Sequence, residues 1–132
     1  MGYDEIHAAF DELIGGQLLA IDNGGFSVKL KNGETRHYEF TEDDGDCCGY
    51  ATITGKMLVE DNSARNPIIT NVEIEGNDGA AWRDYVKICL FGGNAILAEI
   101  ESTASSGSGW YYGACAWITC RETEKDTTIT SW

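Results

Sequence analysis

Positive charge is scarce in this sequence of 132 residues. Nine Lys and Arg residues stand against 22 Asp and Glu residues, which gives a net charge of −13. Proteins that bind nucleic acid neutralise its phosphates with clustered Lys and Arg, so the composition argues against direct nucleic-acid binding. Strong acidity is common in highly soluble proteins. It also suits a surface that mimics nucleic acid or docks on a basic partner.

Long apolar runs, paired cysteines and an export signal are missing as well. No apolar run is long enough to span a bilayer, so we expect no membrane contact. The N-terminus lacks a charged region followed by an apolar run and a small-residue cleavage site. The five cysteines are odd in number and show no paired short spacing, which predicts free thiols in a reducing compartment. Together these absences predict a soluble, cytoplasmic protein.

Helical periodicity occurs convincingly in one place, near the N-terminus. There four apolar residues recur at helical spacing, and two glycines follow them: Ile6, Phe10, Leu13 and Ile14, then Gly15 and Gly16. This pattern predicts a short helix over 3–15. The rest of the chain alternates in short segments separated by Gly and Asn turns. This pattern predicts an all-β fold, a two-sheet sandwich or rolled barrel of about six to eight mostly antiparallel strands. We expect a single domain over 1–132, with a β-rich core over 17–121 and a loose polar tail over 122–132.

Asn32-Gly33 is the strongest turn signal in the chain, and the alternation around it predicts the strand register. A two-residue loop would place Tyr38 on the wrong face. A three-residue loop over 31–33 instead pairs Phe26 with Tyr38 and restores one apolar face. We therefore expect a bulged turn with Gly33 in the left-handed conformation, and His37 pointing away from the apolar face.

Three further segments carry structural predictions. Residues 68–75 alternate as a strand with one face made of Ile68, Thr70, Val72 and Ile74. A second hairpin is expected over 85–101, turning at Gly92-Gly93-Asn94. Small residues over 102–109 predict a flexible loop that leads into a long strand over 111–121.

Acidic residues accumulate after the first hairpin. Carboxylates near a glycine can wrap a calcium ion, but this run lacks the alternate-position ligands and the closing glutamate of an EF-hand loop. We therefore interpret it as a solvated turn without a metal, forming an acidic surface of Glu39, Glu42, Asp43 and Asp44.

Asp46-Cys47-Cys48 follows, with the adjacent cysteines entering a strand predicted over 49–54. Neighbouring residues on a strand face opposite ways, so one thiol would point to the core and the other outward. Small apolar core residues are the most ordinary interpretation of free cysteines. A zinc site that includes His37 would have poorly spaced ligands. A thiolate nucleophile activated by His37 would be suppressed by the nearby carboxylates, and a redox dithiol normally has two residues between its cysteines.

Tryptophan and tyrosine in small-residue loops give the second kind of candidate site. Rigid aromatic side chains beside such loops often form ligand or partner surfaces, although they can equally pack on the core. The candidate binding residues are therefore Asp46, Cys47, Cys48, Trp82, Trp110, Tyr111 and Tyr112.

These motifs occur in a recognisable order between Phe10 and Cys120. The segments are residues 10–16, the hairpin over 26–40, Asp46-Cys47-Cys48, the strand over 68–75, and residues 106–113. In this order the chain resembles a family of small domains of unknown function from bacteriophage and bacterial genomes, in which an Asp-Cys-Cys stretch and a late Asn-Gly-Tyr-Tyr-like stretch recur. The chain departs from that pattern after Cys48. The resemblance implies a phage-type accessory protein in the bacterial cytoplasm and carries no established activity.

Four functions follow from these observations. The first is a non-enzymatic binding protein that acts on a host protein through an acidic or aromatic surface. The second is a small-ligand binder, for example one that sequesters a nucleotide signal by aromatic stacking. A structural part of a virion is the third, and an enzyme that uses Cys47 or Cys48 with His37 ranks last. We assign no catalytic residue, metal or cofactor.

Overall fold

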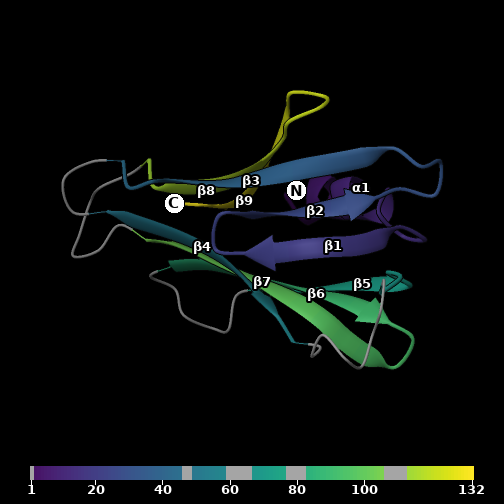
Figure 1. Ribbon diagram of the computed structural model, residues 1–132. Helices are drawn as coiled ribbons and strands as arrows, with labels where there is room; N and C mark the ends of the chain where they lie inside the picture. Colours follow the sequence, from purple (N-terminus) through teal and green to yellow (C-terminus); the bar gives the residue numbers. More distant parts are fainter. Residues whose placement is uncertain (1, 46–48, 59–66, 77–82, 106–112) are drawn as a thin grey trace.

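The computed structural model describes residues 2–45, 49–58, 67–76, 83–105 and 113–132. These residues form one helix and nine strands in two antiparallel sheets that pack face to face without closing into a barrel (Figure 1). Sheet A has the order β1 (Gln17–Asp22), β2 (Gly25–Lys29), β3 (Thr35–Asp43), β8 (Cys115–Cys120), β9 (Lys125–Ser131). Sheet B has the order β4 (Tyr50–Met57), β7 (Ala95–Ser105), β6 (Arg83–Gly92), β5 (Asn71–Gly76). The predicted all-β sandwich is therefore confirmed, with more strands than the expected six to eight.

Helix α1 (Gly2–Asp11) covers one side of the sandwich, where it contacts β5 and β9. It buries Ile6 and Phe10, and the Phe10 ring lies 5.8 Å from that of Phe26. The helix ends four residues before the predicted end of the segment 3–15, because the amides that follow bond to carbonyls three residues back, as in Leu13 to Phe10. Within the described part of the chain, no helix is long and apolar enough to cross a membrane.

The β2–β3 hairpin has the predicted register. Phe26 pairs with Tyr38, and their stacked rings lie 4.5 Å apart between centroids. Gly33 has a φ of +89°, so the predicted left-handed residue at the turn is confirmed. His37 points away from the core, with 47% of its side chain exposed. The β6–β7 hairpin is confirmed as well, with Gly92 paired to Ala95.

The predicted strand over 68–75 is only partly correct. Val72 faces the core as expected, but Ile69 is buried and Ile68 is 47% exposed. The reason is that residues 67–69 bond to the chain at the start of β1, where Leu18 donates to the Pro67 carbonyl at 2.8 Å and Ile69 to that of Gly16 at 2.8 Å. β5 begins only at Asn71, so the inward-facing positions change between the two segments.

The flexible loop predicted over 102–109 is wrong at its start, because β7 continues to Ser105. Ser102 is buried, donates to the Thr52 carbonyl at 2.9 Å, and lies 2.7 Å from the Thr130 hydroxyl of the opposite sheet. Small hydroxyl side chains that look typical of a loop are used here to pair polar groups inside the sandwich.

The loose tail predicted over 122–132 is also wrong. Residues 125–131 form β9, which pairs with β8 and buries Thr127, Ile129 and Thr130. Its β-branched residues favour a strand. Because Thr127 and Thr130 carry hydroxyl groups, a prediction based on hydrophobicity did not identify them as inward-facing. The prediction that the acidic run is a solvated turn is also wrong for most of its length. β3 continues through Glu39 and Glu42 to Asp43, so these residues are in a strand.

Candidate functional site

Trp117 lies on the solvent-facing side of sheet A. Along β8, buried and partly exposed residues alternate, and Ala116, Ile118 and Cys120 point to the core. Trp117 therefore points outward, is partly exposed and is not part of the core cluster. A tryptophan buries more area than most side chains, so a position outside the core points to a role on the surface.

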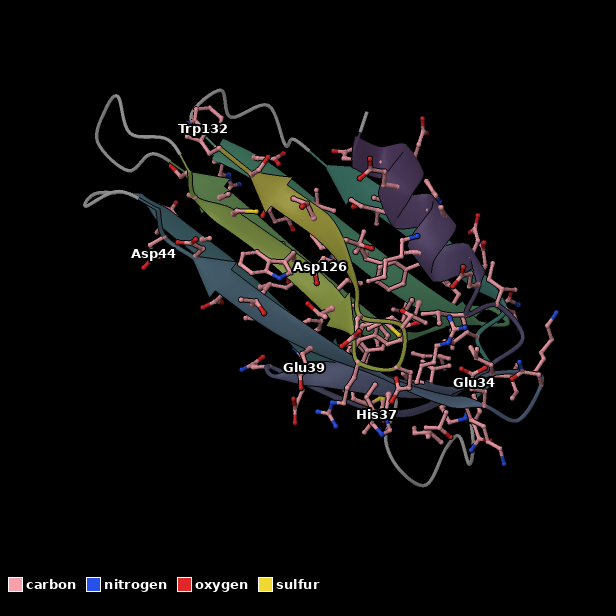
Figure 2. The ribbon with its side chains drawn as sticks, turned by 90° about the horizontal axis from the view of Figure 1, so that it is seen from above. Glu34, His37, Glu39, Asp44, Asp126 and Trp132 are labelled. Carbon is pink, nitrogen blue, oxygen red and sulfur yellow. The ribbon has the colours of Figure 1, made fainter. Side chains whose placement is uncertain are left out.

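Trp117 has short side chains directly beside it and acidic side chains one step further along the adjacent strands. Thr41 on β3 and Thr128 on β9 lie directly opposite it on the two adjacent strands. One step further along, on the same face, the strands carry the exposed acids Glu39, Asp43 and Asp126. Figure 2 looks down on this side of the molecule, with Glu39 and Asp126 labelled. We call Trp117, Glu39, Asp43 and Asp126 the Trp117 surface.

An open hollow of about 410 Å³ adjoins this surface over β2 and β3. Several of its lining residues are small, including Gly25, where a Cβ would collide with the Tyr38 carbonyl oxygen. The lining also includes His37, Glu39 and Arg121, and Arg121 donates to Glu39 at 2.6 Å. Both members of this ion pair are more than half exposed, so it adds little stability and leaves the side chains free to rearrange on binding.

Glu122 holds His37 from the β8–β9 turn. Its carboxylate accepts from the His37 backbone N–H at 2.6 Å and lies 2.7 Å from the ring Nδ1. Burial alone would raise the pKa of Glu122, but the hydrogen bonds to His37 outweigh it and the pKa is lowered. These two contacts fix the ring of His37, which is one of the residues that line the hollow. Figure 2 labels His37.

The four acids predicted as an acidic surface are all exposed, but each also has a contact within the chain. Glu42 accepts from the Ile53 N–H at 2.9 Å and Asp44 from the Ala51 N–H at 3.0 Å. Asp43 accepts from Gly45 at 2.9 Å, and Glu39 pairs with Arg121. Glu42 and Asp44 thus connect the end of β3 to β4 of the opposite sheet, whereas Glu39 and Asp43 lie beside Trp117.

The seven predicted binding residues lie outside the described residues: Asp46, Cys47, Cys48, Trp82, Trp110, Tyr111 and Tyr112. The described residues next to them come together at one end of the sandwich. A Cβ on Gly45 would lie 2.6 Å from the Gly113 carbonyl carbon, and Ser105 pairs with Arg83 and with Tyr50. The roles of the seven residues stay predictions.

A small, partly open pocket lies next to α1, lined by residues that include Glu12, Arg36, Tyr38 and Cys120. Its volume of about 20 Å³ is enough for one water molecule. Arg36 hydrogen-bonds to the Tyr38 hydroxyl and donates to Glu12 at 3.0 Å, and so connects β3 to the residue that follows α1. Burial is the main cause that raises the pKa of Tyr38 to about 12. This cluster is too small for a ligand.

Two of the three described thiols lack the lowered pKa that a reactive cysteine needs. Cys89, Cys115 and Cys120 are free, and burial raises the pKa of both Cys89 and Cys115. A thiol with a raised pKa is a poor nucleophile. Among the described residues there is no group of three or more His, Cys, Asp or Glu side chains that could hold a metal ion.

Comparison with protein-family models, with curated proteins and with solved structures found no match to this chain. The resemblance to a phage domain family therefore stays a prediction. Trp117 was missed as a site residue, although the sequence carried a signal. Ala116, Ile118 and Cys120 alternate with it, so a strand with its apolar face inward leaves Trp117 outside.

Proposed function

We propose that this chain is a non-enzymatic binding protein that engages a basic segment of a host protein through the Trp117 surface. The resemblance noted in the sequence supports a phage-type accessory protein acting in the bacterial cytoplasm. The observation that carries the proposal is the outward position of Trp117, among short Thr side chains and bordered by acids.

The chemistry of the surface fits a partner rich in Lys or Arg. A cation over an indole face is attracted by the ring, and flanking carboxylates add charge complementarity. The net charge of −13 would steer a basic partner toward the protein at low salt. Tryptophan is also among the residue types that most often dominate the binding energy of an interface.

The test is quantitative capture from bacterial lysate with matched variants. We expect Trp117→Ala to weaken retention of the specific partner by ~30-fold or more, the usual effect of a dominant interface residue. The triple variant Glu39→Gln, Asp43→Asn, Asp126→Asn should also weaken it, and should flatten its dependence on salt concentration.

The matched control is the double variant Glu73→Gln, Glu75→Gln, which removes acids from exposed positions of β5 in sheet B. It should capture the same partner as the wild type. Equal capture by Trp117→Ala and the wild type would overturn the proposal. The small-ligand, virion and enzyme alternatives stay predictions, and the hollow beside Trp117 is where a small ligand would be sought.

A further inference from the structure

The edge of β4 carries a segment that would be expected to self-associate. β4 is at the edge of sheet B and pairs only with β7 among the described strands. Residues 49–55, Gly-Tyr-Ala-Thr-Ile-Thr-Gly, contain no charged residue and no proline. An uncharged, β-branched segment on an open edge pairs readily with another strand.

Two carboxylates from the other sheet occupy this edge. Glu42 accepts from the N–H of Ile53 at 2.9 Å, and Asp44 accepts from the N–H of Ala51 at 3.0 Å. The two amides are two residues apart, the spacing at which an adjacent antiparallel strand would accept hydrogen bonds. Glu42 and Asp44 therefore hold the positions that the carbonyl groups of an added strand would take.

The capped stretch borders open space. Its inner face is covered: at Gly55, an added Cβ would lie 2.6 Å from the Asp22 carbonyl oxygen, so the end of β1 packs on the buried face of β4 there. Beside the stretch lies an open hollow of about 470 Å³ lined by residues that include Glu42, Ile53 and Thr54. The carboxylate of Glu42 and the residue whose amide it accepts from, Ile53, therefore both border an open hollow.

The other sheet uses similar devices at its edges. The N–H of Ser131 on β9 donates to the Asp84 carboxylate of sheet B at 2.9 Å. Leu18 on β1 donates to the Pro67 carbonyl at 2.8 Å. Ser131 is therefore another edge amide that a carboxylate of the opposite sheet caps, whereas Leu18 bonds to the backbone of a segment outside the strands of sheet B.

We propose that Glu42 and Asp44 are gatekeepers that prevent β4 from pairing with β4 of a second copy of this chain. A second copy is the expected occupant because the segment carries no charge to repel itself, and antiparallel pairing of identical strands forms a closed two-fold dimer. With the caps in place, such pairing would bury two carboxylates without partners, which is strongly unfavourable.

The test is sedimentation velocity of the full chain over a range of concentrations. The double variant Glu42→Ala, Asp44→Ala should show a concentration-dependent rise toward twice the chain mass of 14.4 kDa. Its self-association should be at least ~10-fold tighter than that of the wild type. Adding Thr52→Lys to this variant should reverse the rise, because Thr52 is exposed on β4 and like charges on two paired copies repel.

Two controls separate capping from charge. Glu42→Gln, Asp44→Asn keeps an acceptor oxygen at each amide and should sediment like the wild type. Glu73→Ala, Glu75→Ala removes the same charge from β5 and should also behave like the wild type.

A folded double Ala variant that sediments like the wild type at every concentration would overturn the proposal. Association of the Gln and Asn variant as tight as that of the Ala variant would overturn it too, because charge and not capping would then be the cause. If the double Ala variant does not fold, the single variants Glu42→Ala and Asp44→Ala are measured instead. A rise in mass for either supports the proposal, and no rise for both contradicts it.

Discussion

Acidic side chains in this protein have two kinds of environment. Glu42 and Asp44 accept hydrogen bonds from backbone amides of the opposite sheet, and these bonds take up donors that would otherwise be free at an edge. Glu39, Asp43 and Asp126 lie around Trp117 on an exposed face. A variant that replaces all of these acids at once would therefore disturb both the contact between the two sheets and the Trp117 surface. Separate isosteric substitutions at each group of acids would distinguish the two effects.

Tyr38 offers a test of the polar cluster next to α1. Burial, and to a lesser extent proximity to Cys120, raise its pKa from 10.0 to about 12, although the Arg36 hydrogen bond opposes this shift. Because the pKa is raised on folding, the stability from the neutral hydroxyl is complete below pH 10 and is lost as pH rises through 12.

We predict that Tyr38→Phe removes the latest tyrosinate step, near pH 12, from the ultraviolet absorbance titration. The variant should also lose less of its free energy of unfolding between pH 10 and 12 than the wild type does. At neutral pH it should be less stable by ~1 kcal/mol, since the Arg36 hydrogen bond is lost. Loss of absorbance amplitude near pH 10, with the step near pH 12 unchanged, would contradict the prediction and show that the hydroxyl is accessible to solvent.

At the scale of elements, β9 is an integral strand of the sandwich. Ile129 is 4% exposed and belongs to the core cluster, whereas its neighbour Thr128 is exposed. We predict that Ile129→Ala lowers the free energy of unfolding by ~2–5 kcal/mol, through lost burial and a residual cavity. Thr128→Ala should change it by less than ~0.5 kcal/mol.

Urea denaturation of both variants provides the measurement, with the slope of each transition checked against the wild type. If Ile129→Ala were as stable as Thr128→Ala, the C-terminal strand would not be packed in the core, and the tail expected from the sequence would be the better description.

The β2–β3 hairpin could be predicted from the sequence because its information is local. The loop at Asn32-Gly33 and the alternation that places Phe26 opposite Tyr38 specify the register without any distant contact. The helix was predicted for the same reason, since Ile6 and Phe10 repeat with its period.

The elements that were predicted wrongly depend on distant partners. Ile68 and Ile69 have the opposite exposure to the predicted one, because residues 67–69 bond to Gly16 and Leu18 at the start of β1. Ser102 and Thr130 look polar in sequence, but they are buried because each satisfies the other across the core. The candidate site was missed for a related reason: Trp117 has its acidic neighbours only when β3, β8 and β9 are adjacent.

At the scale of the whole molecule, the two sheets protect each other's edges and leave their outer faces to solvent (Figure 1). The core is filled from both sheets and from α1, and the small pocket next to the helix holds no more than about one water molecule. On the described residues, the proposed binding therefore uses an open surface, and the Trp117 surface places an aromatic side chain beside three carboxylates.

A footprint of the chain with and without its captured partner would locate the binding surface. Hydroxyl radicals label Trp117, and carbodiimide coupling labels Glu39, Asp43 and Asp126. We predict that all four residues are protected in the complex, while Glu73 and Glu75 on sheet B keep the labelling of the free chain. Protection of Glu73 and Glu75 with unchanged labelling of Trp117 would contradict the assignment of the Trp117 surface.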